Sequence, residues 1–277
     1  MAFAAEWNGN ALAAAKAFDI KTDDAATAPG KWADYTRLGV NGVCDAAAAA
    51  DGSPLLLSLV TADRALAAAQ SVAPHLTTGA LYCDFNSVAP HTKLAAAAIV
   101  EAAGGLYIDV AIMAPVRPPA LATPLLVSGP HAGTAIDALS SIGFAARPIG
   151  ARIGDAAMIK MLRSIMVKGL EALSAECFLA AAAAGLTDEV VQSLPEPGGG
   201  ADWASIADYN LDRMMVHGLR RAAEMEEVAE ALEALGADGT MSRAAAEAQR
   251  RIGAMRLQPA SGLPAKSRMI LERCDVL

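Results

Sequence analysis

The stretch ALYCDFNSVAP, residues 80–90, contains a short apolar run, a change to polar side chains and a proline. An apolar run of this length without polar alternation is typical of a strand that is buried on both faces of a sheet. The polar residues and the proline that follow favour a turn leading out of the strand. The stretch therefore predicts one strand of an α/β domain, with hydrogen-bonding side chains at the strand's end.

The same texture recurs through the first half of the chain. The other short apolar runs are AKAFD (15–19), GVNGVC (39–44), PLLLSLV (54–60), LYIDVAIM (106–113) and TPLLVSG (123–129). Alanine-rich helical stretches, such as residues 62–72 and 89–103, lie between several of these runs. Alternation of strands and helices predicts a parallel sheet that is covered by helices on both faces.

From Gly154 onward the strand-like runs stop and the pattern becomes helical. Gly185 is a natural C-cap for the first helix, and Asp202 is a natural N-cap for the second. The predicted helices span residues 156–184, 202–236 and 243–255, with PEPGGG (195–200) as a loop and the last twenty residues loosely ordered. The sequence thus predicts an α/β domain over residues 1–152 and an all-α domain over residues 153–277.

Composition excludes several classes of protein. The 277 residues are 54% hydrophobic and 19% charged, which indicates a globular chain with a large core. A net charge of −8 argues against nucleic acid as a partner and leaves a small anionic substrate open. The longest apolar run, residues 177–184, is too short to cross a bilayer, and MAFAAEWNGN lacks the basic start of a signal peptide. We expect a cytoplasmic protein without a membrane partner.

The cysteines point to no metal site and no disulfide framework. Cys44, Cys83, Cys177 and Cys274 are widely spaced and have no histidine at metal-ligand spacing. We expect buried, reduced thiols and no bound metal.

Polar residues at the strand ends are the first candidates for a ligand site, because α/β sheets bind ligands at the carboxyl ends of their strands. Asp19 follows the first predicted strand, where an acid can accept hydrogen bonds from the ribose hydroxyls of an adenine dinucleotide and repel a 2′-phosphate. Val60 and Thr61 end another strand, and Asn86 and Ser87 end the next.

The stretch GDAAMIKMLRSIMVKG, residues 154–169, places a cationic stripe on an otherwise apolar helix. The residues that share the stripe are Lys160, Arg163, Ser164 and Lys168. A lysine in a cleft can act as a general acid and base when burial or a neighbouring cation lowers its pKa. The alternative is a solvated face on which Lys168 pairs with Glu171, and periodicity alone favours that alternative.

A second cationic group, His217, Arg220 and Arg221, lies on the second long helix. A histidine packed between helices is its simplest interpretation, and the other interpretation places His217 and Arg220 at a partner subunit's site. The remaining histidines have no serine or cysteine in a nucleophile context, so no hydrolytic triad is predicted.

Three segments taken together, LYCDFNSVAP, LYIDVAIMAPV and GDAAMIKMLRSIMVKG, resemble the β-hydroxyacid dehydrogenases in order and spacing. That family includes 3-hydroxyisobutyrate dehydrogenase and 6-phosphogluconate dehydrogenase. The sequence is most similar to a phosphogluconate dehydrogenase-like branch with a distinctive helical C-terminal domain, from about residue 12 to residue 256. The resemblance implies a Rossmann-like NAD(P)-binding domain followed by an all-α domain for substrate binding and dimerisation.

The resemblance also implies an activity, which is hydride transfer between a small hydroxy acid and NAD or NADP. Lys160 matches the family's lysine that takes the hydroxyl proton. The implied substrate contacts are Asn86, Ser87, Met113, Arg163 and Ser164. The implied cofactor contacts are Asp19, Val60, Thr61 and Asn86. Asp19 favours NAD slightly, since Lys21 is the one basic residue close to it in sequence.

Two departures from the family pattern bear on the substrate. The family's Ser-Gly-Gly loop is replaced by Met113-Ala114-Pro115, and the usual polar residues after the lysine are replaced by Arg163 and Ser164. These changes argue against 6-phosphogluconate as the substrate. We hypothesise that Arg163 supplies the anion contact that the missing loop would have made.

A third departure lies at the start of the chain. The family begins with a strand that runs into G-x-G-x-x-G, and no such strand or glycine fingerprint precedes Asp19. We therefore expect a Rossmann-like sheet without its central first strand, two unpaired sheet edges and weak cofactor binding. Two rival functions stay open, a dimeric scaffold without turnover and an imine reductase on the same fold.

Overall fold

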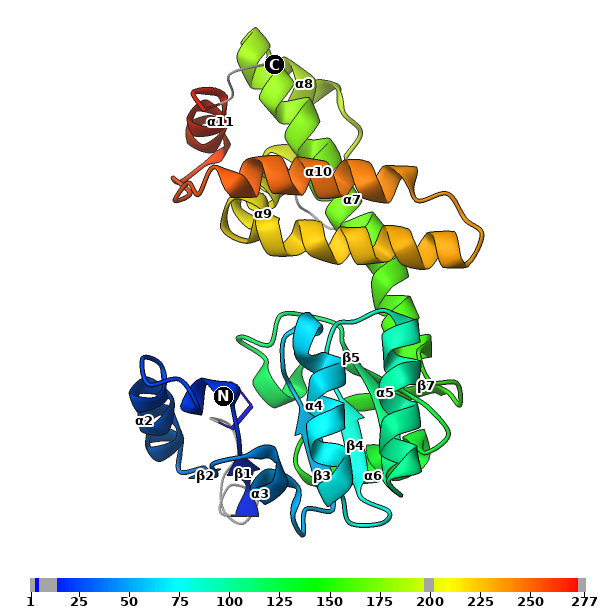
Figure 1. Cartoon of the computed structure of the whole chain (residues 1–277). Coiled ribbons are helices and arrows are strands. Elements are labelled where there is room, and N and C mark those ends of the chain that lie inside the picture. The colour runs from blue at the N-terminus through cyan, green and yellow to red at the C-terminus, as the bar shows by residue number, and fades with distance from the viewer. Residues whose placement is uncertain (1–2, 5–13, 197–201, 274–277) are drawn as a thin grey trace. The chain divides into compact units, whose positions relative to one another are not determined.

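The computed structural model describes residues 3–4, 14–196 and 202–273. The chain forms two compact units, Met1–Lys160 and Met161–Leu277, and the division falls within helix α7, Asp155–Ala184 (Figure 1). The first unit is built of strands and helices and the second of helices alone. The predicted fold class, an α/β Rossmann-like domain followed by an all-α domain, is confirmed.

All six predicted strands form in the first unit. The strands are β1 (Lys16–Ala17), β2 (Asn41–Gly42), β3 (Leu55–Ser58), β4 (Leu81–Asp84), β5 (Leu106–Ile112), β6 (Leu125–Ser128) and β7 (Ala146–Gly150). The seventh strand was not expected, because its sequence, ARPIG, lacks an apolar run and contains a proline. It lies at the edge of its sheet, where the missing N–H of Pro148 is tolerated.

The strands belong to two sheets. Strands β3 to β7 form one sheet in the order β3-β4-β5-β6-β7, and β1 and β2 form a separate parallel pair. Among the described residues no strand joins the two sheets. The prediction of a wholly parallel sheet is wrong at β6, which runs antiparallel to β5. The segment between Ile112 and Leu125 holds one 3-10 turn and no crossover helix, so the chain returns in the opposite direction.

Helices cover both faces of the five-stranded sheet, which explains its continuous apolar runs. The helices of the first unit are α2 (Ala28–Leu38), α3 (Ala46–Ala50), α4 (Ala65–Val72), α5 (Pro90–Ala102) and α6 (Ala132–Ser141). Helices α4 and α5 lie side by side and pack on the face of Tyr82 and Tyr107 (Figure 1). Helix α6 packs on the opposite face, around Cys83 and Ile108. Successive strand residues thus enter two different cores.

A buried ionic network lies beneath the ends of the strands. Lys93 of α5 is fully buried, and its Nζ lies 3.3 Å from Asp84 Oδ1 and 3.2 Å from Asp109 Oδ1. The same Nζ donates a hydrogen bond to the Asp84 carbonyl oxygen at 2.7 Å. Tyr107 donates its hydroxyl proton to Asp84 Oδ2 at 2.6 Å, and burial together with the Asp84 charge raises the pKa of Tyr107. One lysine therefore holds two carboxylates from neighbouring strands.

The second carboxylate of this network also fixes the start of α7. Asp109 Oδ2 accepts hydrogen bonds from the N–H groups of Gly154 at 3.2 Å and Ala157 at 3.1 Å, and from the Ser128 hydroxyl at 2.9 Å. Ser128 Oγ in turn accepts from the Ala156 N–H at 3.1 Å. The first N–H groups of a helix lack partners within the helix and favour a negative charge. An aspartate on β5 and a serine on β6 thus serve as remote caps for α7.

The second unit follows the predicted helical pattern. Its helices are α7, α8 (Thr187–Ser193), α9 (Trp203–Ala234), α10 (Thr240–Ala254) and α11 (Leu263–Leu271). Asp202 caps α9 by accepting a hydrogen bond from the Ser205 N–H at 2.8 Å, as the sequence predicted. Part of the predicted loop PEPGGG lies outside the described residues. The expectation of a loosely ordered C-terminal segment is wrong over α11, where Lys266 is buried and pairs with Asp208 at 2.9 Å and Asp212 at 3.3 Å.

Helices α9 and α10 pack closely because glycines face each other at their contact. A Cβ atom added at Gly218 would lie 2.3 Å from the Gln249 carbonyl oxygen and 2.8 Å from the Gly253 Cα. A Cβ atom added at Gly253 would lie 2.6 Å from the Leu219 nitrogen. Each of these contacts is with backbone, which cannot rotate away, so both positions require glycine.

Replacing Gly218 with alanine should lower the free energy of unfolding by about 1–3 kcal/mol, because the added methyl overpacks a backbone contact. Urea unfolding followed by circular dichroism measures the change. Gly133→Ala is the matched control, since no atom lies within 4 Å of its added Cβ and alanine favours a helix. Equal stability of the two variants would contradict the proposed close contact.

Replacing Lys93 with methionine should destabilise the protein by about 3–5 kcal/mol, because two buried carboxylates lose their counterion. Denaturant unfolding at neutral pH measures the loss. Lys16→Met is the control, because Lys16 is exposed and bonds one carbonyl oxygen, that of Asp51. A Lys93→Met loss below about 1 kcal/mol would show that the network contributes little.

Candidate functional site

Asn86 joins the carboxyl ends of β3 and β4. Its Oδ1 accepts a hydrogen bond from the Val60 N–H at 2.7 Å, and its Nδ2 donates to Ser58 Oγ at 2.9 Å. Its own N–H donates to Asp84 Oδ1 at 2.8 Å, which ties the turn to the Lys93 network. The side chain is buried, so its polar atoms hold the two strand ends together. The structure thus brings Val60 and Asn86, two of the predicted cofactor contacts, together.

Lys160 and Ser87 meet at the same end of the sheet. The Lys160 Nζ donates a hydrogen bond to Ser87 Oγ at 2.7 Å, although the two residues are far apart in the chain. Ser87 is exposed and follows the buried Asn86 directly, while Lys160 is half-buried on the second turn of α7. Because Asp109 fixes the first turn of α7 and Asp84 fixes the turn before Ser87, both partners are anchored to one network.

This pair can carry acid–base chemistry. An amine that is held by a hydroxyl oxygen has a defined position from which to accept or return a proton. The Ser87 hydroxyl accepts from Lys160 and retains its own proton, which it can donate to a bound oxygen. The arrangement therefore offers one proton carrier and one hydrogen-bond donor at an accessible strand end.

Asp19 lies at the end of β1, as predicted, and has an unpredicted cationic partner. Its Oδ2 lies 2.5 Å from the Nζ of Lys31 on α2, and its Oδ1 accepts from the Lys21 N–H at 3.1 Å. Burial acts to raise the pKa of Asp19, but the bonds and charges of Lys31 and Lys21 outweigh it and hold that pKa below its usual value. The inference that Lys21 alone offers a positive charge near Asp19 is wrong, because helix α2 returns Lys31 to the strand end.

Two further residues predicted as ligand contacts, Thr61 and Met113, differ in their exposure to solvent. Thr61 is exposed after β3, and its carbonyl oxygen accepts from the Arg64 N–H at the start of a 3-10 turn. Met113 lies half-buried after β5 and packs against the apolar cluster that includes Leu126 and Ala156. Met113 therefore supports the start of α7 through apolar contact.

In the second unit the cationic stripe is divided between surface and core. Arg163 is exposed, whereas Lys168 is buried and forms an ion pair with Glu224 of α9 at 2.7 Å. Lys168 also donates to Ser164 Oγ at 3.1 Å. Burial lowers the pKa of Lys168 against the opposing effect of Glu224. A continuous cationic face over all four positions is thus not present, since Lys168 belongs to the packing of α7 on α9.

The predicted pairing of Lys168 with Glu171 is wrong. Glu171 is buried and instead binds Arg221 through both carboxylate oxygens, and it accepts a hydrogen bond from Gln249 Nε2 at 2.7 Å. The second cationic group is divided in the same way, because Arg221 points into this network while His217 lies nearer the surface. Burial and the charges of neighbouring arginines lower the pKa of His217.

Sequence reasoning missed the residues that position the site. Asp84 and Asp109 are directly paired across β4 and β5, and their facing carboxylates require a cation between them. Lys93 lies in an alanine-rich helix, where a lysine is typical of a solvated surface. Two aspartates at matching positions of neighbouring predicted strands were the one signal that could have revealed it.

The described part of the chain contains no cluster of three potential metal ligands. None of the helices in that part is long and apolar enough to cross a membrane. The expectation of buried thiols holds for Cys83, whose pKa burial raises to about 12, and is wrong for the exposed Cys44 and Cys177. Cys274 lies outside the described residues.

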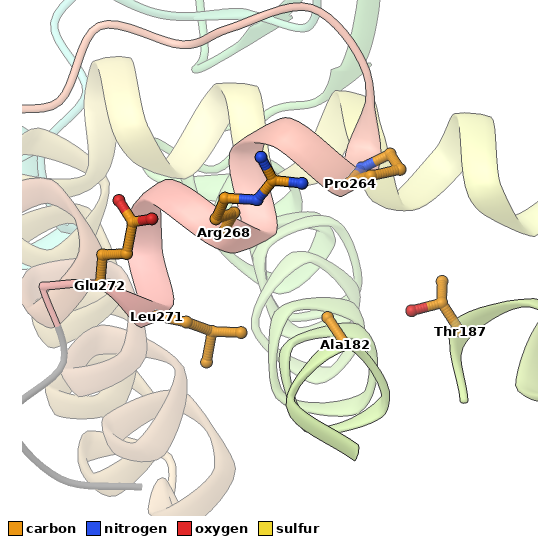
Figure 2. A pocket seen from close by; sticks show the side chains of 6 residues that line it. All are labelled: Ala182, Thr187, Pro264, Arg268, Leu271 and Glu272. Carbon is orange, nitrogen blue, oxygen red and sulfur yellow. The ribbon is translucent and has the colours of Figure 1, made fainter. Parts of the chain in front are cut away.

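A depression in the second unit contains none of the predicted site residues. The residues that line it are Ala182, Thr187, Pro264, Arg268, Leu271 and Glu272. Figure 2 shows its two charged members, Arg268 on α11 and Glu272 directly after the end of that helix. They carry opposite charges, so the depression presents no net charge of its own.

Comparison with known proteins found one domain family and several similar solved structures. Residues 181–252 match the model of a domain of unknown function, DUF1932. A conserved hypothetical protein from Sinorhizobium meliloti 1021 is 36% identical, with a TM-score of 0.79, over 98% of this chain and 92% of that chain.

Two further solved structures connect the fold to a known class of enzyme. The conserved protein MTH1747, described as structurally similar to 3-hydroxyacid dehydrogenases, is 30% identical over 84% of this chain and 87% of that chain, with a TM-score of 0.67. The 3-hydroxyisobutyrate dehydrogenase of Mycobacterium tuberculosis shares the fold at 16% identity, over 88% of each chain and with a TM-score of 0.67. The chain belongs to the family of 3-hydroxyacid dehydrogenase-like proteins represented by MTH1747, and its DUF1932 match lies in the helical C-terminal domain.

Proposed function

We propose that this chain is an NAD(P)-dependent oxidoreductase of the β-hydroxyacid dehydrogenase type, acting on a small anionic hydroxy acid. The observation that carries the proposal is the hydrogen bond between Lys160 Nζ and Ser87 Oγ, at the carboxyl end of the sheet. Ligands of α/β sheets bind at this end. Structural similarity to dehydrogenases, one of them solved in complex with NADP+, supports the same proposal.

In the proposed reaction Lys160 moves the proton of the substrate hydroxyl. During oxidation its neutral amine takes that proton as the carbon–oxygen double bond forms, and during reduction the ammonium returns it. A nicotinamide bound in the first unit would supply the acceptor for the hydride on the carbon that carries the hydroxyl group. Ser87 keeps the amine in place and offers its own proton to the substrate oxygen. The oxidation releases one proton and forms a carbonyl acid.

Arg163 and Ser164 follow Lys160 by one helical turn and are the proposed substrate contacts of the second unit. Arg163 is exposed, and a guanidinium can hold a carboxylate through two parallel hydrogen bonds. Asn86 supports this function indirectly, by setting the position of the turn that carries Ser87. In this assignment the first unit binds the nucleotide, with Asp19, Val60 and Thr61 as contacts.

The proposed enzyme is a homodimer that pairs through α7. Four large apolar side chains on one stripe of this helix are exposed: Leu162, Met166, Leu170 and Leu173. Gly169 lies on the same stripe, and no atom lies within 4 Å of a Cβ added there. Glycine within a helix costs about 0.5–1 kcal/mol relative to alanine, and close approach of a second helix would account for it.

Replacing Leu170 with glutamate should convert a dimer into a monomer, because it places a charge at the centre of the apolar stripe. Sedimentation velocity measures the change in mass. Leu235→Glu is the control, since Leu235 is also exposed but lies at the C-terminal end of α9. A wild-type monomer, or a dimer that survives Leu170→Glu, would contradict pairing through α7.

The activity is tested by reduction of short keto acids and semialdehydes with NADH or NADPH. Lys160→Met should lower kcat by about 100-fold or more, because general acid–base catalysis is lost, while nucleotide affinity stays within about threefold. Arg152→Gln, which removes an exposed cation just before α7, is the matched control and should keep full activity.

The alternatives are separated by the same assay. Turnover of cyclic imines in place of keto acids would replace the proposal with an imine reductase. Failure of the wild-type protein to bind either nucleotide would favour a scaffold without turnover. Unchanged kcat in Lys160→Met would remove Lys160 from the mechanism and leave the nucleotide site intact.

A further inference from the structure

Lys31 of α2 places a positive charge beside Asp19, at the end of β1, and this charge bears on which nucleotide the proposed site selects. Lys31 Nζ lies 2.5 Å from Asp19 Oδ2, and the Lys31 side chain is 14% exposed. The Nζ also lies 6.0 Å from the centre of the Tyr35 ring, within the range of a cation–π contact. Lys31 is therefore held in place by neighbours on two sides, and is not a freely moving surface lysine.

Asp19 is not an isolated acid, because positively charged side chains lie close to its carboxylate. Asp19 carries one negative charge, and Lys31 and Lys21 each carry a positive charge close to it. An isolated acid at this position accepts bonds from the ribose hydroxyls and repels a 2′-phosphate, which carries close to two negative charges. With Asp19 paired to Lys31, a phosphate at the ribose would meet a cation beside the acid. The paired carboxylate has also lost part of its capacity to accept a hydroxyl proton.

A second group at the same place has an unused hydrogen-bonding capacity. The Tyr35 hydroxyl is buried and has no hydrogen-bond partner among the described residues. Burial and the nearby Asp19 charge raise its pKa to about 12, so it remains a neutral donor. A buried donor without an acceptor is costly, and an anionic ligand at this strand end is one acceptor that could satisfy it.

We propose that Lys31 makes this protein select NADP(H) over NAD(H), by neutralising Asp19 and binding the 2′-phosphate. The inference rests on the proposed function, because it assigns the cofactor of the same nucleotide site. It reverses the preference for NAD that Asp19 alone indicates. The reversal depends on a contact between Asp19, which follows β1, and Lys31 of α2, twelve positions later, which no local sequence pattern reveals.

The test is a fluorescence or calorimetric titration of the full chain with NADPH and with NADH. The wild-type protein should bind NADPH at least about tenfold more tightly, the effect of one charge-assisted hydrogen bond. Lys31→Gln should lose about tenfold in NADPH affinity and keep or gain NADH affinity, because Asp19 is then free to bind ribose and repel phosphate. Lys31→Arg keeps the charge and should keep the preference.

Two more variants separate selectivity from misfolding. Asp19→Asn removes the repulsion and keeps Lys31, so it should move the affinity ratio further toward NADPH, opposite to Lys31→Gln. Arg37→Gln removes an exposed cation of the same helix, paired with Asp34 alone in the described contacts, and should leave the ratio unchanged. A general loss of structure would weaken the binding of both nucleotides, and it cannot shift the affinity ratio in opposite directions in two variants.

The outcomes distinguish this inference from the function on which it rests. Tighter binding of NADH by the wild-type protein, or an unchanged ratio in Lys31→Gln, overturns the role of Lys31 while nucleotide binding itself stands. Absence of binding to both nucleotides overturns the proposed function and the selectivity with it. A ratio that moves in opposite directions in Lys31→Gln and Asp19→Asn supports the inference.

Discussion

The contact of Lys93 with Asp84 and Asp109 is the constraint on which the first unit depends. Removing three charged groups from water is expensive, and the structure offsets this cost through the Tyr107 hydroxyl and the first N–H groups of α7. Asp84 uses its second oxygen to accept the Tyr107 hydroxyl proton, and Asp109 uses its second oxygen to accept N–H groups at the start of α7. The network thus pairs the buried charges of the sheet and also fixes the turn of Asn86 and the start of α7 at the carboxyl end of the strands.

The candidate site follows from this anchor in two directions. Through Asp84 the network fixes the turn of Asn86, whose side chain also holds the end of β3. Through Asp109 it fixes the first turn of α7, and Lys160 lies on the next turn. The bond between Lys160 and Ser87 joins the two branches. An accessible proton-carrying group is therefore placed by buried charges that touch no substrate, which is how a rigid scaffold supports a site on its surface.

Sequence patterns predicted the elements well and their pairing less well. Apolar runs and alanine-rich stretches located six strands and the long helices, since periodicity reports how a segment buries its own side chains. The direction of β6 depended on the lack of a crossover helix, and β7 is a half-exposed edge strand without an apolar run. Helix α11 forms because Lys266 reaches two aspartates on α9, which is a property of the packed unit.

The sequence by itself determined the fold class and the family. It also located Asp19 and Asn86 at the ends of strands and Lys160 near the start of a long helix. Only the tertiary structure decided the partner of each charge: Lys31 for Asp19, Glu224 for Lys168 and Arg221 for Glu171. The physical reason is that helix and strand propensities act over a few neighbouring residues, whereas an ion pair forms wherever folding brings two charges together. The same residue types therefore give a solvated surface or a binding site according to the contacts that the fold supplies.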